Sequence, residues 1–284
     1  MNSSIIGYFP LADLFERSAP TILSFAGDND HYDEFKIGDW KTFVFRNASG
    51  EDEDGFVGGA QSGTRLTPRG RQLPELNAWI EATFRLDLLR LARIHSLGDG
   101  VLIPHRDFVE FLDEKPAWTR IHIPIMTNDQ CLHAEEDTVF RMRLGEVWHF
   151  DASRLHSATN FSAQRRLNLC LDFELGDLPL SAIFQYAGDA RGDIAPEIVE
   201  RPPLTHRFER GILCLSQVLN DYSYRQVVGL LSRIPFYVDV SLEQVFEWLN
   251  RIARDSGDEA LHAKSTDFSR FLRVERGMQE RFAL

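Results

Sequence analysis

Cysteine is scarce in this chain of 284 residues, and its placement excludes two common uses of the thiol. The three cysteines, Cys131, Cys170 and Cys214, are far apart, odd in number and set in apolar stretches, and no Cys-x-x-Cys pair occurs. Neither a disulfide framework nor a cysteine-ligated zinc site is therefore expected. We expect free, buried thiols in a reducing compartment.

Long hydrophobic runs are also missing. The opening stretch, MNSSIIGYFPLADLFERS, has neither a basic start nor an extended apolar segment, so it does not predict a signal peptide. No segment approaches the ~20 consecutive apolar residues that cross a bilayer. Internal repeats and low-complexity tracts are absent from the sequence as well. These absences predict a cytoplasmic protein.

Positive charge is in the minority, with 31 Lys and Arg against 43 Asp and Glu and a formal net charge of −12. A protein this acidic is a poor candidate for binding nucleic acid or an anionic membrane surface. Small molecules or basic partners are expected instead. What the chain does contain is a 43% hydrophobic composition with 21 phenylalanines, enough for a large, β-rich core.

The spacing of apolar residues changes along the chain and predicts an α+β protein. Residues 50–72, rich in glycine and charge, predict a long loop, and Pro74 opens a stretch with helical spacing. Between about residues 86 and 176, short alternating segments separated by turn residues predict an antiparallel sandwich or barrel. From about residue 204 the spacing becomes helical again.

We therefore predict two domains. The first covers residues 1–200, with α/β elements before a β core at about 86–176, and the second is a helical domain at 201–284. The helices of the second domain are interpreted as packing elements, with a homodimer surface as the alternative.

Two polar residues interrupt the apolar segment VLIPHRDFVEFL, residues 101–112, which reads as a buried strand. Because residues i and i+2 of a strand share a face, His105 and Asp107 are expected to project together, and Arg106 to point away. Burying them costs free energy unless a partner such as a metal ion satisfies them. With His156 they form the two-histidine, one-carboxylate set that binds Fe(II). A buried hydrogen-bonded network without metal is the alternative.

An arginine follows the second histidine by ten residues. The segment NFSAQR, residues 160–165, predicts a turn, so His156 and Arg166 are expected near each other on two adjoining strands. An arginine inside a sheet needs an anion, and its planar fork matches a carboxylate. Since neighbours in a strand face opposite ways, Arg165 is expected at the surface. A dicarboxylate that chelates iron at one end and meets Arg166 at the other is 2-oxoglutarate.

The region 92–174 resembles the double-stranded β-helix, or jelly-roll, core of the Fe(II)/2-oxoglutarate dioxygenases, in their aspartyl/asparaginyl β-hydroxylase-like branch. The segments that carry the resemblance are IPHRDFVE, TRIHIPI, LGEVWHFDASRLHSATNFS and RRLNLCLDFEL. Within this branch the chain is most similar to bacterial proline 3-hydroxylases and to hydroxylases of cyclic amino acids such as pipecolic acid. The upstream motifs YDEF, GDWK and NASGEDED and the helical C-terminal region fit that group too.

The resemblance implies roles for the metal and cosubstrate residues. By position, His105, Asp107 and His156 match the Fe(II) ligands, which are also the catalytic centre. Arg166 matches the arginine that binds the distal carboxylate of 2-oxoglutarate. Related halogenases lack the carboxylate ligand, so its presence here favours hydroxylation.

Further residues are implied near 2-oxoglutarate or the substrate. Arg120, His122 and His133 stand where this branch places groups around the 2-oxoglutarate carboxylates or the substrate. Arg93 or Arg120 is expected to bind the carboxylate of the amino acid substrate. The alternatives without a binding role are a surface ion pair for Arg93 and hydrogen-bonded core or rim histidines for His122 and His133. His95 is expected to be structural or exposed.

The implied activity is hydroxylation of a free cyclic amino acid, L-proline or L-pipecolic acid, at C3, with 2-oxoglutarate and O2 consumed and succinate and CO2 released. His122 stands where the proline hydroxylases carry an aromatic residue, so the choice between the two substrates is open. Hydroxylation of another amino acid, or of Asp or Asn side chains in a peptide, is the second candidate activity. A non-catalytic cupin-like sensor of a small acid is a rival from another class, and a zinc hydrolase is disfavoured because the HExxH motif is absent.

Overall fold

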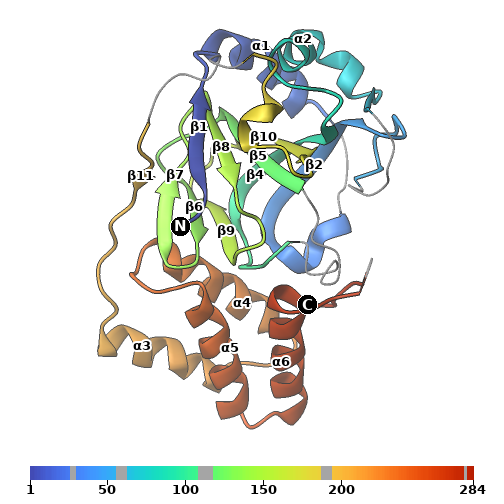
Figure 1. Ribbon diagram of the computed structural model, residues 1–284. Coiled ribbons are helices and arrows are strands. Elements are labelled where there is room, and N and C mark those ends of the chain that lie inside the picture. The colour runs from blue at the N-terminus through green and yellow to red at the C-terminus, as the bar shows by residue number, and fades with distance from the viewer. Residues whose placement is uncertain (26–29, 56–62, 108–117, 187–193, 278–279) are drawn as a thin grey trace.

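The computed structural model describes residues 1–25, 30–55, 63–107, 118–186, 194–277 and 280–284. Figure 1 shows a curled sheet in the middle of the molecule, with helices α1 and α2 at one end and α3 to α6 at the other. Within these ranges, no helix is both long and apolar enough to pass through a bilayer.

The strands form one curled antiparallel sheet. They are β1 (Ser4–Tyr8), β2 (Lys36–Asn47), β3 (Arg65–Leu66), β4 (Leu89–Leu102), β5 (Trp118–Met126), β6 (Cys131–Glu135), β7 (Thr138–Arg141), β8 (Glu146–Phe150), β9 (His156–Asn160), β10 (Arg166–Glu174) and β11 (Glu197–Ile198). Their order is β1-β8-β5-β10-β4-β9-β6-β7-β11, and β2 pairs with β3 and β4.

The long strand β4 gives the sheet two walls. On one side it pairs with β2; on the other it pairs with β10 between Leu89 and Leu97 and then with β9 at Gly100 and Val101. Glycine permits the close crossing of β2 over β4, since Gly38 has φ +99° and a Cβ there would lie 2.4 Å from the carbonyl oxygen of Asp99. The first wall is therefore β1-β8-β5-β10-β4-β2, the second is β9-β6-β7-β11, and the predicted jelly-roll core is confirmed.

The helices cover the two ends of this core. They are α1 (Ala12–Leu23), α2 (Pro74–Thr83), α3 (His206–Leu213), α4 (Tyr224–Arg233), α5 (Glu243–Asp255) and α6 (Glu259–Arg273). Short 3-10 turns are η1 (Asp30–Phe35), η2 (Gly70–Gln72), η4 (Leu180–Ile183), η5 (Cys214–Gln217) and η6 (Ile234–Phe236). As predicted, Pro74 opens α2, where its missing N–H removes no helical hydrogen bond. The Asp258 side chain caps α6 by accepting from two backbone N–H groups.

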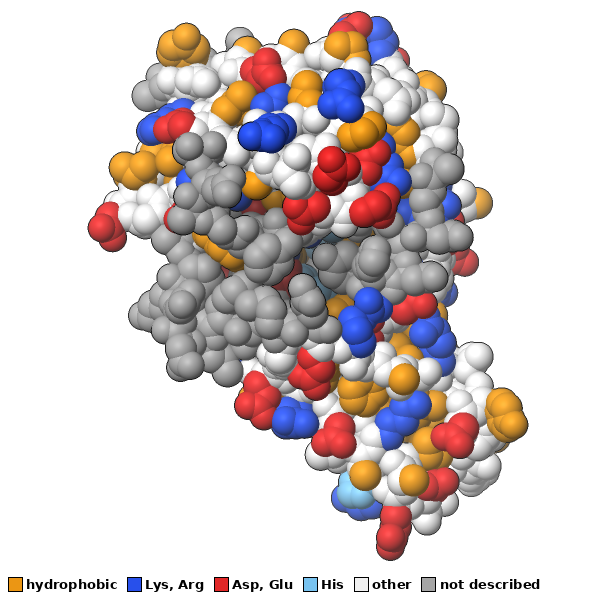
Figure 2. Space-filling view, turned by 90° about the vertical axis from the view of Figure 1, so that its right-hand side faces the viewer, with side chains coloured by type: hydrophobic (Ala, Val, Ile, Leu, Met, Phe, Trp, Pro, Cys, Tyr) orange, Lys and Arg blue, Asp and Glu red, His pale blue; other side chains and the backbone are white. Residues whose placement is uncertain are grey.

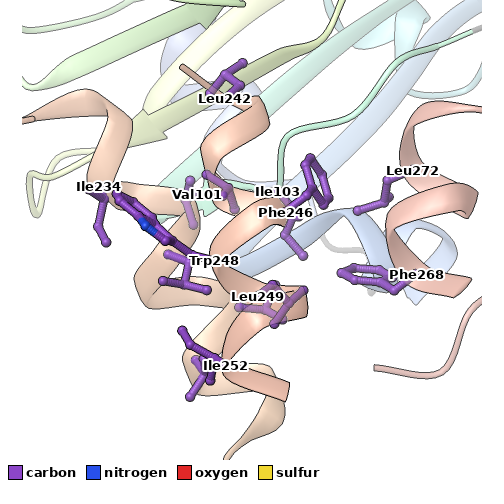
Figure 3. Packing of buried hydrophobic residues seen from close by; sticks show 14 of the residues in the cluster. Val101, Ile103, Ile234, Leu242, Phe246, Trp248, Leu249, Ile252, Phe268 and Leu272 are labelled. Atoms are coloured by element: carbon purple, nitrogen blue, oxygen red, sulfur yellow. The ribbon is translucent and has the colours of Figure 1, made fainter. Parts of the chain in front are cut away.

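Apolar packing joins the C-terminal helices directly to the sheet. One buried cluster combines residues of α4, α5 and α6 with residues of the sheet, among them Val101, Leu132 and Val139. Figure 3 shows Val101 and Ile103 lying beside side chains of these helices. A second cluster fills the space between α1, α2 and the first wall. The division into domains 1–200 and 201–284 stays a prediction.

Four expectations about local structure were wrong. Cys131 and Cys170 are buried as expected, but Cys214 is exposed. Strand β4 ends at Leu102, so His105 and Asp107 lie beyond it instead of inside a strand; residues 108–112 are outside the described part. Strands β9 and β10 do not pair with each other, because both pair with β4. The loop predicted at 50–72 includes the short β3 and η2, and its residues 56–62 are not described.

Candidate active site

Three metal-ligand side chains come together between the end of β4 and the start of β9. The ligand atoms of His105, Asp107 and His156 all lie within 4.8 Å of one another. An isolated antiparallel bridge joins the two histidines, with both N···O distances 3.0 Å, and their ring centroids are 4.3 Å apart. Nε2 of His105 is 3.4 Å from Oδ1 of Asp107. The backbone bridge thus achieves the convergence that a continuous strand was expected to provide.

The hydrogen bonds of the two imidazoles leave the same nitrogen of each free for a metal. Nδ1 of His105 donates to the carbonyl of Ile103 at 2.8 Å, and Nδ1 of His156 donates to the carbonyl of Arg154 at 2.9 Å. A carbonyl only accepts, so Nδ1 of each ring carries a proton and Nε2 is the nitrogen that can bind a metal. Burial, and then the neighbouring His105, lower the pKa of His156 to about 3, which keeps it neutral. This is the state in which imidazole binds a metal ion.

The carboxylate of the set is ionised. Burial raises the pKa of Asp107, but the Arg120 guanidinium and the two imidazoles outweigh burial and hold the pKa well below its usual range. Arg120 donates to Oδ2 of Asp107, while Oδ1 faces His105. Two imidazoles and one carboxylate fit Fe(II), with room on the metal for further ligands.

A chain of buried charges leads away from the metal ligands. Asp172, at the centre of β10, accepts from Nε of Arg120 at 2.7 Å and lies 3.2 Å from the guanidinium of Arg93. All three side chains are buried, so the surface ion pair considered for Arg93 is wrong. Burial lowers the pKa of Arg120, but Asp172 and Asp107 raise it well above the ordinary value. Both arginines thus belong to a charged network that ends on the ligand Asp107.

Arg166 points into the interior and reaches the opposite wall. Its guanidinium lies against Nε2 of His133 on β6. Because a guanidinium only donates, His133 is neutral and accepts through Nε2; burial and then Arg166 lower the pKa of this histidine well below normal. Burial lowers the pKa of Arg166 to about 10. As expected, Arg165 faces the other way and pairs with Asp39 at the rim.

Polar side chains occupy every second position of β10. Asn168, Cys170 and Asp172 share the inner face, opposite residues of β4 and β5. The amide of Asn168 donates to Nδ1 of His122, so the other nitrogen of this imidazole carries the proton. Burial lowers the pKa of His122 well below normal, and the neighbouring His95 adds to this effect.

His95 joins this inner wall as a partly exposed residue. Its ring lies 5.2 Å from that of Trp40 and 6.1 Å from that of His122, with the two imidazole planes 9° apart. Nδ1 is 3.3 Å from the hydroxyl of Thr42. In Figure 2, histidine side chains are visible through an opening between the sheet above and the helical region below. The rings of His95 and His122 are thus nearly parallel, and that of Trp40 is tilted by 32° from His95.

The sequence analysis missed three residues of this interior, Asp172, Asn168 and His95. A signal for the first two was present, since polar residues at alternate positions of the otherwise apolar strand 166–174 must share a face. The other predicted residues lie on strands of the two walls, and His105 and Asp107 lie just beyond the end of β4; the ligand or substrate that each one binds stays a prediction.

A jelly-roll core with two histidines and an aspartate converging at the junction of its walls defines a non-haem Fe(II)/2-oxoglutarate dioxygenase, the class of enzyme that uses Fe(II), 2-oxoglutarate and O2. The profile of the aspartyl/asparaginyl β-hydroxylase family matches residues 19–175, and that of the L-proline 3-hydroxylase C-terminal region matches residues 180–280. The chain belongs to the aspartyl/asparaginyl β-hydroxylase family, in its L-proline hydroxylase branch.

Three curated relatives define the branch. L-proline cis-3-hydroxylase 1 of Streptomyces sp is 33% identical over 287 residues, which cover 100% of this chain and 99% of the relative. L-proline cis-3-hydroxylase 2 of Streptomyces sp is 34% identical over 289 residues, with the same coverage. L-proline cis-4-hydroxylase of Rhizobium meliloti (strain 1021) is 34% identical over 243 residues, 84% of each chain. The predicted class of enzyme is confirmed.

Proposed function

We propose that the protein hydroxylates free L-proline at C3, with 2-oxoglutarate and O2 as cosubstrates and succinate and CO2 as further products. The observation that carries this proposal is the convergence of His105, Asp107 and His156, with Nδ1 of both histidines bonded to backbone carbonyls. Its support on the substrate side is the match to two L-proline cis-3-hydroxylases over the whole chain.

The metal and cosubstrate residues divide the work as follows. His105, Asp107 and His156 would hold Fe(II), which together with 2-oxoglutarate activates O2 for attack on a C–H bond. Arg166 provides a buried cation for the distal carboxylate of 2-oxoglutarate, and His133 orients its guanidinium. No carboxylate in the described part of the chain forms an ion pair with Arg166, so its charge is balanced when the cosubstrate arrives.

The charged network is suited to a zwitterionic amino acid. Asp172 pairs with both Arg93 and Arg120, and Arg120 also pairs with Asp107. Two buried guanidinium groups thus lie in one network with a candidate metal ligand, which favours an anionic group such as a substrate carboxylate. The oxidant itself is not selective, so the choice of carbon depends on how this anchor orients the ring.

Two features bear on the choice among substrates. The C-terminal part of the chain matches the L-proline 3-hydroxylase profile, which favours attack at C3 over C4. His122 lies on the inner wall, with its ring 4.8 Å from that of Phe150. The resemblance to proline hydroxylases predicts a different aromatic side chain at this position, so L-pipecolic acid, with its larger ring, is the second candidate substrate.

The direct test is substrate-dependent turnover of 2-oxoglutarate by protein loaded anaerobically with Fe(II). We expect L-proline to stimulate succinate formation, and mass spectrometry and NMR to identify cis-3-hydroxyproline. L-pipecolic acid, other free amino acids and Asp- or Asn-containing peptides form the comparison set. If His105→Ala and Asp107→Ala both keep full proline-dependent succinate formation, the proposal is wrong. If the protein binds metal and 2-oxoglutarate but consumes no O2 with any substrate, it is instead a non-catalytic sensor of a small acid.

A further inference from the structure

We propose that the C-terminal helical region takes part in building the metal site: the end of α6, together with Phe35, positions the ligand segment His105–Asp107. This inference rests on the proposed metal site. It gives the helices a role in positioning the metal ligands, beyond the packing or dimerisation that the sequence suggested.

The sheet secures only one edge of the ligand segment. Beyond Leu102 the chain has left β4, and the backbone N–H groups of His105 and Asp107 donate to the carbonyls of His156 and Ala152, at 3.0 and 2.9 Å. These two bonds tie the ligand-bearing residues to the second wall and to the turn before it. Both bonds come from alternate residues, as on one edge of a strand.

The other edge is secured from outside the jelly-roll walls. The N–H of Ile103 donates to the carbonyl of Phe35 at 2.8 Å, and the N–H of Arg106, the residue between the two ligands, donates to the carbonyl of Leu272 at 2.9 Å. Leu272 lies in the last turn of α6, where carbonyls have no partner within the helix. The same bond therefore satisfies the end of the helix and fixes the backbone between the metal ligands.

The Arg106 side chain follows its backbone toward the helices. As expected, it points away from the two ligands, and its guanidinium lies 3.8 Å from Glu243 of α5. Glu243 also pairs with Arg273 of α6. Both C-terminal helices thus contact the residue between the ligands.

The imidazole of His105 is enclosed on two sides. His156 lies on one side at 4.3 Å, and the ring of Phe35 lies 5.1 Å away. Phe35 contacts Phe271 of α6 at 5.8 Å, and the guanidinium of Arg276 lies 5.0 Å from the Phe35 ring. The position of this ligand ring is therefore coupled to the end of α6 and to the chain that follows it.

Phe35 also supports the tautomer of the ligand. Its carbonyl holds the N–H of Ile103, and the carbonyl of Ile103 accepts from Nδ1 of His105. The side chain of Ile103 is buried among residues of α5 and α6, as Figure 3 shows for Phe246 and Leu272. Residues that orient a ligand in this way commonly change metal affinity about 10–100-fold when they are altered.

The test compares two phenylalanines of the same core cluster, Phe35 and Phe236, each replaced by leucine in the full-length protein. Phe236 is even more deeply buried than Phe35, but its ring contacts Phe161 instead of a proposed metal ligand. Co(II) affinity is measured by competition with a chelator, the Co(II) visible spectrum reports the ligand geometry, and melting of the metal-free protein reports stability.

We expect Phe35→Leu to lower Co(II) affinity about tenfold and to change the spectrum. Phe236→Leu should lower the melting temperature comparably and keep affinity and spectrum within twofold of wild type. Equal affinity and identical spectra for Phe35→Leu and wild type would overturn the inference. Failure of the wild-type protein to bind Co(II) would instead overturn the proposed metal site.

A second pair of variants avoids a cavity in the core, in case Phe35→Leu does not fold. Arg276→Gln removes the cation beside Phe35 and Phe271, whereas Arg270→Gln removes an exposed arginine of α6 that pairs with Glu275. We expect Arg276→Gln alone to weaken Co(II) binding, by about twofold to fivefold, as for the loss of one cation–π contact. Arg276→Lys should restore most of the affinity. Indistinguishable affinities for the two glutamine variants would contradict the role of the C-terminal segment.

Discussion

Asp172 and Arg120 form a buried hydrogen bond of 2.7 Å between a carboxylate oxygen and Nε. Through Arg120, this carboxylate at the centre of β10 is connected to Asp107, one of the three proposed metal ligands. Its other oxygen faces Arg93. One side chain thus sets the positions of both arginines that we assign to the substrate carboxylate.

Asp172→Asn is expected to uncouple the reaction. The amide keeps the size of the side chain but removes the counter-charge that two buried guanidinium groups share. We expect hydroxyproline formation to fall about tenfold, while succinate formation falls less, because the substrate carbon is misplaced. Breaking a buried charge pair should also cost ~3–5 kcal/mol of unfolding free energy.

The measurements are the ratio of succinate to hydroxyproline and urea denaturation. Asp87→Asn is the control, since Asp87 forms an exposed pair with Arg85 and its loss should change neither. A variant of Asp172 with wild-type coupling and an unchanged KM for L-proline would show that the network has no part in orienting substrate.

Arg166 offers a test with a matched neighbour. Arg166→Leu should raise the KM for 2-oxoglutarate about 10–100-fold, as expected for the loss of ~1.5–3 kcal/mol in charged hydrogen bonds. Arg165→Leu should leave it within twofold, because that arginine faces the rim and pairs with Asp39. Initial rates at varied concentrations of 2-oxoglutarate give both KM values. Equal values for the two variants would refute the role of Arg166 in binding the distal carboxylate of 2-oxoglutarate.

Acidification should destabilise the metal-free protein. His95, His122, His133 and His156 all have pKa values lowered by burial, so the unfolded chain binds more protons than the folded one below about pH 6.5. Stability is therefore complete above that pH and declines as the pH falls toward the folded pKa values, by up to ~1.4 kcal/mol per histidine and pH unit. The lowered pKa of Asp107 acts in the same direction at lower pH.

Urea denaturation between pH 4.5 and 7.5 measures this slope. His133→Gln should reduce the slope of unfolding free energy against pH by the contribution of one histidine. Replacing the exposed His206 by glutamine should leave this slope unchanged. A stability that is flat over this range would contradict neutral, buried imidazoles in the folded protein.

His95 is expected to affect the amino acid substrate more than the cosubstrate. His95→Phe keeps a flat ring between Trp40 and His122 but removes its hydrogen-bonding nitrogens. We expect the KM for L-proline to rise about threefold to tenfold, in line with one lost hydrogen bond, and the KM for 2-oxoglutarate to stay constant. His149→Phe is the control on β8, where Trp148 is the buried neighbour. Equal effects on both KM values would argue against this wall as a substrate surface.

Much of this site was readable from the sequence because it depends on short-range rules. The His-x-Asp spacing and a distant histidine identified the three residues whose ligand atoms the structure brings within 4.8 Å, and an arginine after a turn was correctly expected to point inward. The alternating pattern from residue 86 onward predicted the antiparallel core, and the helical spacing after residue 204 predicted α3 to α6. Each of these signals has a period of two or about 3.6 residues, which a single chain displays without any knowledge of its partners.

The tertiary structure decided how those residues are held. The bridge between His105 and His156, the position of Asp172 between two arginines and the bond from Arg106 to Leu272 all join segments far apart in the chain. No local period encodes such pairs, since they depend on how the walls of the sheet curl and where the last helix ends. The sequence by itself determined which groups can bind a metal and an anion; only the packing of strands and helices determined their tautomers, charges and orientation.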